Sequence, residues 1–384
     1  MLDNGKAEGA RKIKQIEKYC LRDIAIVSQG FTFSRSYQGK KNLKWNYFKV
    51  ADIGINPNSK YLTNAINTIS DITMEEIGAL PFPKGSIVFP RVGAALFNNN
   101  KKILAQDGVV DDNVLVLTVT DTSKCWYEFL YYYLQGIPLA KWCNSGLVPV
   151  INTKTVLSQM VFLPPLPEQQ KIAAILSTQD KVIELKEKLL AQKQQQKKYL
   201  MQQLLTGKKR LPGFNEKWRF AKLENVSKYS ASAASFKTYE SHLGRGPYPV
   251  YDASGCFGNI DFYENEQPYI SIVKDGAGAG RVALCKEKSS TIGTLGCIFA
   301  NDIDLLYLFY CMSAVDFQIY SNGSTIPHVY YKDYKNMVLY LPCELEQKAI
   351  VEILSAADHE IDLLQKSIEA EKQKKKALMQ LLLT

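Results

Sequence analysis

The sequence lacks several features that would place it in common classes of protein. Its 384 residues contain no apolar run long enough to cross a membrane, and residues 1–19 lack the apolar centre of a signal peptide. Its eight cysteines include no C-x-x-C pair, and its three histidines are scattered. The sequence therefore disfavours a disulfide framework, a zinc site or a histidine metal cluster, and it predicts reduced thiols in the cytoplasm.

Motifs for catalysis are also missing or incomplete. A glycine-rich segment at 276–280 is followed by a predicted strand at 281–284, whereas a dinucleotide fold needs a helix there. The Gly-Lys pair at 207–208 lacks the first glycine of a P-loop, and the Glu-Leu-Lys triplet at 184–186 lacks the Pro-Asp of a nuclease motif. No Asn-Pro-Pro-aromatic or Asp-Pro-Pro-aromatic motif of an amino-methyltransferase occurs. The chain is therefore predicted to be non-catalytic on its own.

The strongest positive feature is an internal repeat. Residues 163–206, LPPLPEQQKIAAILSTQDKVIELKEKLLAQKQQQKKYLMQQLLT, align with residues 341–384 without a gap, at a constant offset of 178 (341 against 163). Nearly half of the aligned positions are identical, which similar helical composition alone would not produce. The chain therefore consists of two half-proteins, each a globular part followed by a long segment.

Both repeated segments are predicted to be long helices. Prolines at 164, 165 and 167 exclude a helix before them, and Pro167 suits the first helical turn. Apolar residues then recur every seven positions, which indicates a partner helix along one stripe. This helix seam comprises Leu176, Ile183, Leu190 and Leu204 in the first copy and Leu354, Ile361, Ile368 and Leu382 in the second. An amphipathic helix packed on its own domain is the alternative, but the length and the duplication favour two helices packed on each other.

The rest of the sequence divides into two mixed α/β parts. In each part, short β-rich runs, such as KWNYFKVADIG at 44–54, alternate with turn signals, and one buried helix is expected, at 126–136 and at 305–317. Residues 1–20 are a polar lead-in, for which a helix is one option. The predicted domains are residues 1–162 with the lead-in, the helix 163–206, the linker and second domain 207–340, and the helix 341–384. The predicted fold class is α+β: two mixed α/β target-recognition domains joined by two long antiparallel coiled-coil-like helices, with an internal pseudo-two-fold repeat.

This order of parts resembles the specificity subunit of type I restriction–modification systems. The resemblance covers residues 20–384 and rests on the helix start LPPLPEQ, the linker LLTGKKRLPGF at 204–214 and the two domain openings, GFTFSRSYQG…KWNYFKVADIG and GPYPVYDASGCFGNIDFY. It implies a non-catalytic subunit that reads a bipartite, asymmetric site in double-stranded DNA. The implied partners are two methyltransferase subunits and, in some systems, restriction subunits. Those partners would bind the cofactors, S-adenosylmethionine in the methyltransferase and ATP with magnesium in the restriction subunit.

The repeat is physically suited to such a role. Two direct repeats whose helices pack antiparallel are related by a pseudo-two-fold axis, and a DNA duplex has the same kind of axis. The two domains differ in sequence, so their half-sites should differ. The two helices are alike, so they should offer equivalent docking surfaces to a partner.

The net charge of +9, with its basic excess in the first 214 residues, is compatible with a nucleic-acid partner. Phosphates are contacted by Lys, Arg and amides, and bases are read by forked donors such as Arg and Asn. The candidate DNA-binding residues are Arg35, Lys40, Lys41, Lys44, Arg91, Asn98, Asn99, Asn100, Lys101, Lys102, Arg245, Lys274, Arg281, Asn322, Ser324 and His328. For each of them, a solvated surface residue is the alternative interpretation.

Two other functions stay open at this stage. One is an enzyme, such as a nuclease, whose site is assembled from scattered residues; metal-dependent cleavage by the purified chain would reveal it. The other is a coiled-coil adaptor with no role on DNA, which band-shift assays with the methyltransferase partner would distinguish.

Overall fold

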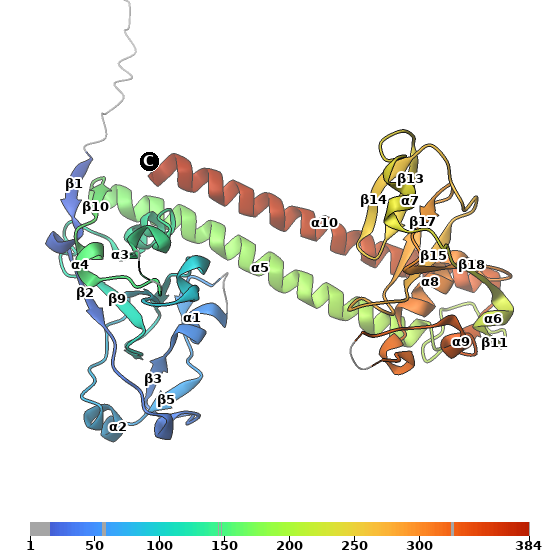
Figure 1. The fold of residues 1–384 in the computed structure, drawn as a ribbon. Helices are drawn as coiled ribbons and strands as arrows, with labels where there is room; N and C mark the ends of the chain where they lie inside the picture. Colours follow the sequence, from blue (N-terminus) through green and yellow to red (C-terminus); the bar gives the residue numbers. More distant parts are fainter. Residues whose placement is uncertain (1–15, 56–58, 145, 147, 324–325, 384) are drawn as a thin grey trace, which may run out of the picture. The chain divides into compact units, whose positions relative to one another are not determined.

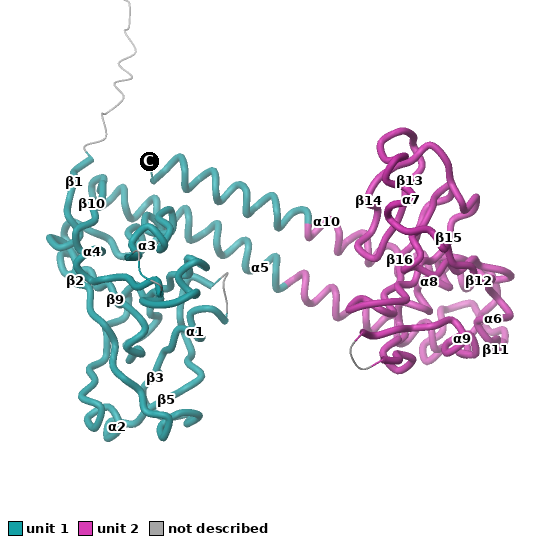
Figure 2. The backbone as a smooth tube through the Cα atoms, in the orientation of Figure 1, with its two compact units in different colours: residues 1–188, 366–384 teal, residues 189–365 magenta. Residues whose placement is uncertain are grey.

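The computed structural model of the chain describes residues 16–55, 59–144, 146, 148–323 and 326–383 (Figure 1). The chain forms two compact units, unit 1 with residues 1–188 and 366–384 and unit 2 with residues 189–365 (Figure 2). Helices α5 (Leu166–Leu204) and α10 (Glu344–Leu383) each contribute to both units. Within the described residues, no helix is both long enough and apolar enough to cross a membrane.

The described residues of unit 1 form three sheets. The largest is five-stranded, in the order β2-β9-β6-β7-β4, and a three-stranded sheet has the order β5-β3-β8. A two-stranded antiparallel ladder joins β1 to β10, with Glu17 opposite Leu163. The strands are β1 (Glu17–Cys20), β2 (Ala25–Gln29), β3 (Trp45–Phe48), β4 (Tyr61–Leu62), β5 (Asn67–Ile69), β6 (Ile87–Pro90), β7 (Lys102–Leu104), β8 (Val109–Val110), β9 (Val114–Val119) and β10 (Met160–Leu163).

The core of unit 1 forms where helix α3 and the start of α5 pack on the five-stranded sheet. Buried α3 residues, such as Leu130, meet Leu176 of α5 in one apolar cluster, and Leu378 and Leu382 of α10 pack against it. Burying a leucine side chain contributes about 1.5–3 kcal/mol, so both long helices stabilise this unit. The helices are α1 (Val50–Ile55), α2 (Asp71–Glu76), α3 (Tyr127–Gln135), α4 (Thr153–Leu157) and the 3-10 turns Leu21–Asp23, Arg35–Tyr37, Ala94–Asn98 and Leu139–Trp142.

Unit 2 repeats this plan. It has a four-stranded sheet, β12-β18-β15-β16, a three-stranded sheet, β14-β13-β17, and a two-stranded ladder, β11-β19. The strands are β11 (Arg219–Lys222), β12 (Ser227–Ser230), β13 (Tyr248–Asp252), β14 (Gly255–Ile260), β15 (Tyr269–Val273), β16 (Val282–Cys285), β17 (Ser290–Thr291), β18 (Leu295–Ala300) and β19 (Val338–Leu341). The helices besides α5 and α10 are α6 (Leu223–Val226), α7 (Phe236–Glu240), α8 (Leu305–Ser313), α9 (Tyr331–Tyr334) and the 3-10 turn Phe317–Tyr320.

The core of unit 2 is built in the same way. Helix α8, the four-stranded sheet and both long helices share one apolar cluster, to which α5 contributes Leu204 and α10 contributes Ile350 and Leu354. In each unit, therefore, the core includes residues from both α5 and α10.

Several predicted elements are confirmed. The buried helix expected at 126–136 is α3, and the strand expected after the glycine-rich segment is β16. The helix expected at 305–317 is α8, but it ends earlier, at Ser313, and Phe317 begins a separate 3-10 turn. The two long helices begin slightly later than predicted because Leu163 and Leu341 end strands β10 and β19.

Other predictions were wrong. Residues 17–20 of the lead-in form strand β1, because they pair with β10, which is distant in the sequence; residues 1–15 lie outside the described residues. The segment KWNYFKVADIG is a strand only in its first half. Its second half is helix α1, beside which the Asp52 carboxylate accepts hydrogen bonds from the Lys49 and Ile66 amides.

Candidate functional site

In unit 1, the two long helices are joined by a charged cluster. Asp180 of α5 accepts a hydrogen bond from the Tyr132 hydroxyl of α3 (2.7 Å), and its other oxygen lies 2.5 Å from Lys375 Nζ of α10. Lys375 also lies over the Tyr132 ring, 5.9 Å from its centroid. Burial and the neighbouring Asp180 charge raise the pKa of Tyr132, so its hydroxyl stays protonated and acts as the donor. This arrangement fixes α3, α5 and α10 to one another.

Unit 2 contains the same cluster. Tyr310 of α8 donates to Asp358 of α10 (2.8 Å), and Lys197 of α5 contacts the other oxygen of Asp358 (2.5 Å) and lies over the Tyr310 ring. Burial raises the pKa of Tyr310 to about 12. Each of the three residues is 178 positions from its counterpart in unit 1, so the internal repeat extends from the helices into the domains. The two lysines are those that interrupt the predicted helix seam.

A second duplicated contact lies at the start of each long helix. The Gln169 side chain accepts a hydrogen bond from the Trp126 amide (2.8 Å) and donates to the Pro164 and Lys124 carbonyls. Its counterpart Gln347 likewise accepts from an amide, that of Asp304 (3.0 Å), and donates to the Pro342 carbonyl. Both glutamines are buried and bonded in this way, so they tie the start of each long helix to the neighbouring segments of its domain.

Further ion pairs and hydrogen bonds join the two long helices within each unit. In unit 1, Lys186 reaches Glu371 (2.7 Å), which also accepts from Gln179, and these two bonds lower the pKa of Glu371. The Lys372–Glu187 pair follows in unit 1 and the Lys193–Glu360 pair in unit 2, both at close range. Later residues of α5 pair with earlier residues of α10, so the two helices run antiparallel.

The helix-seam residues are unevenly buried. Leu176, Ile183, Leu204, Leu354 and Ile368 are buried, while the others, Leu190, Ile361 and Leu382, are half-buried. Leu176 belongs to the core of unit 1 and Leu204 and Leu354 to that of unit 2, whereas Ile183 and Ile368 are buried outside these two clusters. Ion pairs and hydrogen bonds also join the two helices within each unit.

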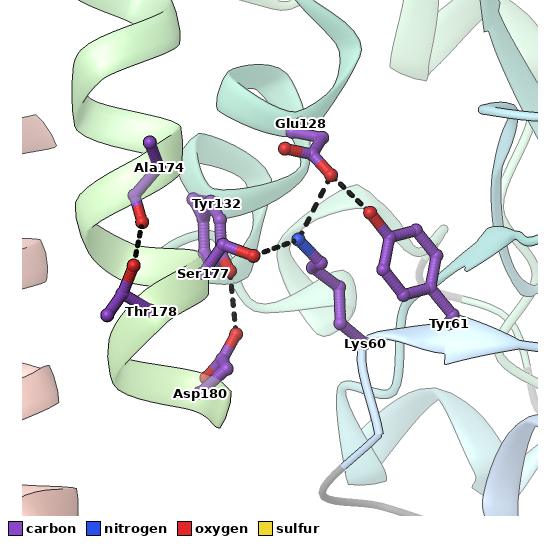
Figure 3. Close-up of polar contacts among 8 residues, drawn as sticks. All are labelled: Lys60, Tyr61, Glu128, Tyr132, Ala174, Ser177, Thr178 and Asp180. Carbon is purple, nitrogen blue, oxygen red and sulfur yellow. Dashed lines mark hydrogen bonds and ion pairs between the residues drawn. The ribbon is translucent and has the colours of Figure 1, made fainter. Parts of the chain in front are cut away.

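One buried ion pair distinguishes unit 1 from unit 2. Lys60 Nζ donates to Glu128 Oε1 (3.1 Å) and Ser177 Oγ (2.9 Å), and Tyr61 donates to the same Glu128 oxygen (Figure 3). The Lys60 side chain is only 5% exposed. At the position equivalent to Glu128, unit 2 has Leu306. The cluster anchors the loop before β4 to α3 and α5 in unit 1.

The predicted DNA-binding residues of unit 1 are placed in very different environments. Arg35, Lys40, Lys41 and Lys44 are exposed around the turn after β2, where Lys44 pairs with Asp71 (2.8 Å). The remaining candidates lie nearer the five-stranded sheet. Asn98 is exposed, Asn99 and Asn100 are half-buried, and Arg91 is half-buried with an Nε atom that has no hydrogen-bond partner among the described residues.

Two of the predicted residues, Lys101 and Lys102, are buried, with 2% of each exposed. The Lys101 ammonium donates to Asn99 Oδ1 (2.6 Å) and to the Ile137 carbonyl (2.9 Å), and Lys102 donates to the Ser59 carbonyl. Burial lowers the pKa of Lys101 to about 7 and that of Lys102 to about 8. Neither ammonium is placed to contact DNA in this fold, so both leave the candidate set.

The candidates of unit 2 do not form one cluster. Lys274, Asn322 and His328 come together beside the end of β15, where His328 Nδ1 lies 2.7 Å from Asp275. Arg281 is exposed and donates to the Ala253 carbonyl, and Arg245 is exposed on another part of the unit. Ser324 lies outside the described residues.

The known proteins that resemble this chain agree with its architecture. A family model described as the type I restriction modification DNA specificity domain matches residues 13–194 and 215–372, once in each repeat. The chain belongs to this specificity family. It is accordingly a DNA-recognition subunit of a type I restriction–modification system and not a catalytic one, and both the resemblance and the predicted fold class are confirmed.

Relatives support the assignment over the whole chain. The MjaX type I restriction enzyme specificity subunit of Methanocaldococcus jannaschii is 25% identical over 95% of this chain and 92% of its own. The MjaVIII specificity subunit of the same organism is 37% identical over 33% of the chain and 30% of its own. In fold, the chain is similar to the S subunit from M. genitalium (TM-score 0.65, 14% identity, 98% of each chain). It is also similar to a chain in a structure of type I system assembly and conformational transition (TM-score 0.58, 14% identity, 96% of each).

Sequence reasoning missed the two tyrosines of the duplicated cluster in this specificity subunit. Tyr132 and Tyr310 lie before the aligned helices, yet they keep the offset of 178. Continuing the alignment backwards from Leu163 would have paired them. The aspartates Asp180 and Asp358 are identical positions of the aligned helices, but a charge on a helix surface gives no sign of its partner.

The duplicated cluster supplies a prediction with an internal control. We expect a double-mutant cycle on Asp180 and Lys375 (D180N, K375M) to give a coupling energy of about 0.5–3 kcal/mol, because the residues are in direct contact. The matching cycle on Asp358 and Lys197 should give a smaller value, because the Asp358 side chain is 40% exposed against 16% for Asp180. Urea unfolding of the four variants in each cycle measures both. Additive effects in both cycles would contradict the prediction.

Burial of Lys101 predicts a pH dependence. Its folded pKa of about 7 lies below its unfolded value, so above pH 7 the unfolded chain binds more protons and stability rises with pH. Relative to K101M, wild-type stability should therefore increase between pH 7 and 10, by at most about 1.4 kcal/mol per pH unit. Melting curves over this range test it. K84M, at an exposed lysine, controls for the loss of one charge, and a wild type to K101M difference that does not change with pH would refute the prediction.

Proposed function

We propose that this specificity subunit reads a bipartite, asymmetric DNA site, one half-site with each unit. We propose further that its paired helices carry two methyltransferase subunits. The single observation that supports both parts is the contrast between the repeats. The Tyr-Asp-Lys cluster and the buried glutamine recur at a constant offset. The segments that carry the exposed basic groups differ: Arg35, Lys40, Lys41 and Lys44 lie between β2 and β3, whereas the equivalent segment of unit 2, between β12 and β13, has only Lys237 and Arg245 as its lysines and arginines.

This contrast has a direct physical meaning. Two copies of one partner need two equivalent surfaces, so the partner should bind where the repeats agree. Two different half-sites need two different surfaces, so DNA should be read where the repeats differ. A single chain with both properties suits an asymmetric DNA site and a symmetric pair of partners.

The chemistry would then belong to the partners. S-adenosylmethionine would be held by the methyltransferase subunits, and ATP and magnesium by a restriction subunit where one is present. The chain itself would contribute DNA affinity through exposed cations such as Lys40, which lies over the Tyr37 ring, and Lys41. A subunit that acts on chromosomal DNA in this way would work in the cytoplasm.

Exchanging one domain tests the division of labour. We expect replacement of residues 218–340 by the corresponding domain of another specificity subunit to change one half-site and leave the other unchanged. The reason is that unit 1 contributes no residue to the exchanged segment. Sequencing methylated DNA from cells with the hybrid complex gives the result. A hybrid in which both half-sites changed would refute independent reading.

Shortening α10 tests the scaffold. Deleting residues 366–384 removes Lys375 and the leucines that pack on unit 1, but it leaves Ile350 and Leu354 in the core of unit 2. We expect the shortened chain to keep unit 2 folded and to bind one methyltransferase subunit instead of two. Native mass spectrometry counts the subunits, and hydrogen exchange reports folding of unit 2. Retention of two bound partners would contradict the proposal. The full-length chain, measured in the same way, is the control.

A further inference from the structure

The two units share a loop frame beside their largest sheets. In unit 1 it consists of residues 91–93, after β6, and residues 149–151; in unit 2 it consists of residues 274–276, after β15, and residues 327–329. The backbone hydrogen bonds are the same in both. In unit 1 they run from Ile151 N to Arg91 O (2.9 Å) and from Gly93 N to Pro149 O (3.0 Å); in unit 2, from Val329 N to Lys274 O (2.8 Å) and from Gly276 N to Pro327 O (3.0 Å).

Glycine is required at one position of the frame. Gly93 has a φ of +84° and Gly276 a φ of +91°, a region that other residues rarely adopt. A further bond closes the frame on the other side, from Asn144 N to Val150 O (3.1 Å) and from Asn322 N to His328 O (2.8 Å). The backbone of the loop frame is therefore built alike in both units.

The side chains that face each other across this frame are not alike. Val92 is bridged to Val150 in unit 1, and Asp275 is bridged to His328 at the same place in unit 2. The Asp275 and His328 side chains are 37% and 34% exposed, and the two valines are also half-buried. An apolar pair in one unit thus corresponds to a hydrogen-bonding pair in the other, at a surface that a ligand can reach.

Basic residues flank the facing pair in both units. The residue before it in the chain is Arg91 in unit 1 and Lys274 in unit 2. On the other side, the exposed Lys154 and Lys332 are counterparts at an offset of 178. In unit 2, Lys332 lies over the Tyr330 ring, on which His328 stacks at 5.8 Å. Shared cations beside a differing pair are what DNA reading requires, because phosphate contacts position a protein and base contacts specify the sequence.

We propose that the loop frame is the base-reading element of each unit, with Val92 and Val150 determining specificity in unit 1 and Asp275 and His328 in unit 2. The flanking Lys154 and Lys332 contact phosphates in both half-sites. This inference rests on the proposed function, and it assigns the reading to particular side chains.

The chemistry of each pair predicts the base that it selects. A carboxylate accepts hydrogen bonds, so in the Asp275–His328 contact Nδ1 is the donor. With Nδ1 as the ring's one N–H, Nε2 is left as an acceptor. In the major groove, an acceptor meets the amino group of adenine or cytosine. Two valines have no hydrogen-bonding groups and suit the methyl group of thymine. The half-site of unit 2 should therefore require an amino-bearing base at one position, and that of unit 1 a thymine.

The experiment exchanges the pairs in the complete complex with its methyltransferase subunits. D275V/H328V should reduce discrimination at one base pair of the unit 2 half-site by roughly tenfold or more, and V92D/V150H should do so in the unit 1 half-site. K154A and K332A should lower affinity for all sequences and reduce the salt dependence of binding by about one counterion each. Methylated-base sequencing reads the first effect, and titration of duplexes at several salt concentrations reads the second.

The chain offers a matched control for these variants. His242 and Asp261 form another partly exposed pair in unit 2 (2.8 Å), outside the loop frame. H242V/D261V should leave both half-sites unchanged. If D275V/H328V does not assemble, the milder H328Q should still change preference at the same base pair.

The outcomes separate this inference from the function on which it rests. A wild-type complex without any bipartite sequence preference would overturn the proposed function. A wild-type complex with a defined site, together with exchange variants that keep every base preference, would overturn only the assignment of the loop frame. An equal loss of preference in the H242V/D261V control would also overturn that assignment.

Discussion

In each unit, one partly buried ion pair ties the long helices to each other and to the domain. A seam of leucines and isoleucines alone would tolerate a shift of one heptad, because each position would meet a similar side chain seven residues away. Such a shift would place Ile368 or Leu382 opposite Asp180 in place of Lys375. A carboxylate with 16% exposure would then lose its partner, which costs far more than the pair itself contributes. The ion pair therefore selects the register, and the apolar contacts stabilise the register it selects.

The sequence predicted most of the architecture because the relevant signals are local or repeated. A gapless repeat, prolines before each helix and a sevenfold apolar pattern define α5 and α10 without any knowledge of the fold. Strand β1 was missed because its only reason to be extended is pairing with β10, more than a hundred residues away, and a polar lead-in gives no local sign of that. Helix α1 was missed because its residues belong to a run whose composition is typical of a strand. The hydrogen bond at its start, from the Lys49 amide to the Asp52 carboxylate, cannot be seen in the sequence.

The sequence predicted candidate site residues only in part, and the predictions that the structure contradicts have a common cause. Residue type indicates what a side chain can bind, but exposure decides whether it is available. Lys101 and Lys102 have the right chemistry for phosphates, yet they bond to carbonyl and amide oxygens inside unit 1. The exposed Lys154 and Lys332, which we propose as phosphate contacts, were not among the candidates because neither stands in a basic cluster. What draws attention to them is their equivalent position in two copies of one fold.

The division of α10 between the units gives the chain an unusual order of assembly during synthesis. Residues 1–188 of unit 1 are translated first, but residues 366–384 of the same unit, which pack on its core, emerge only after all of unit 2. At roughly 5–20 residues per second, the ribosome needs on the order of 10–40 s to cover the intervening sequence. During that interval Asp180 lacks Lys375, and the surface that Leu378 and Leu382 later cover is open to water. The nascent first half is therefore the stage at which the protein is most exposed to proteases and to pairing with the wrong helix.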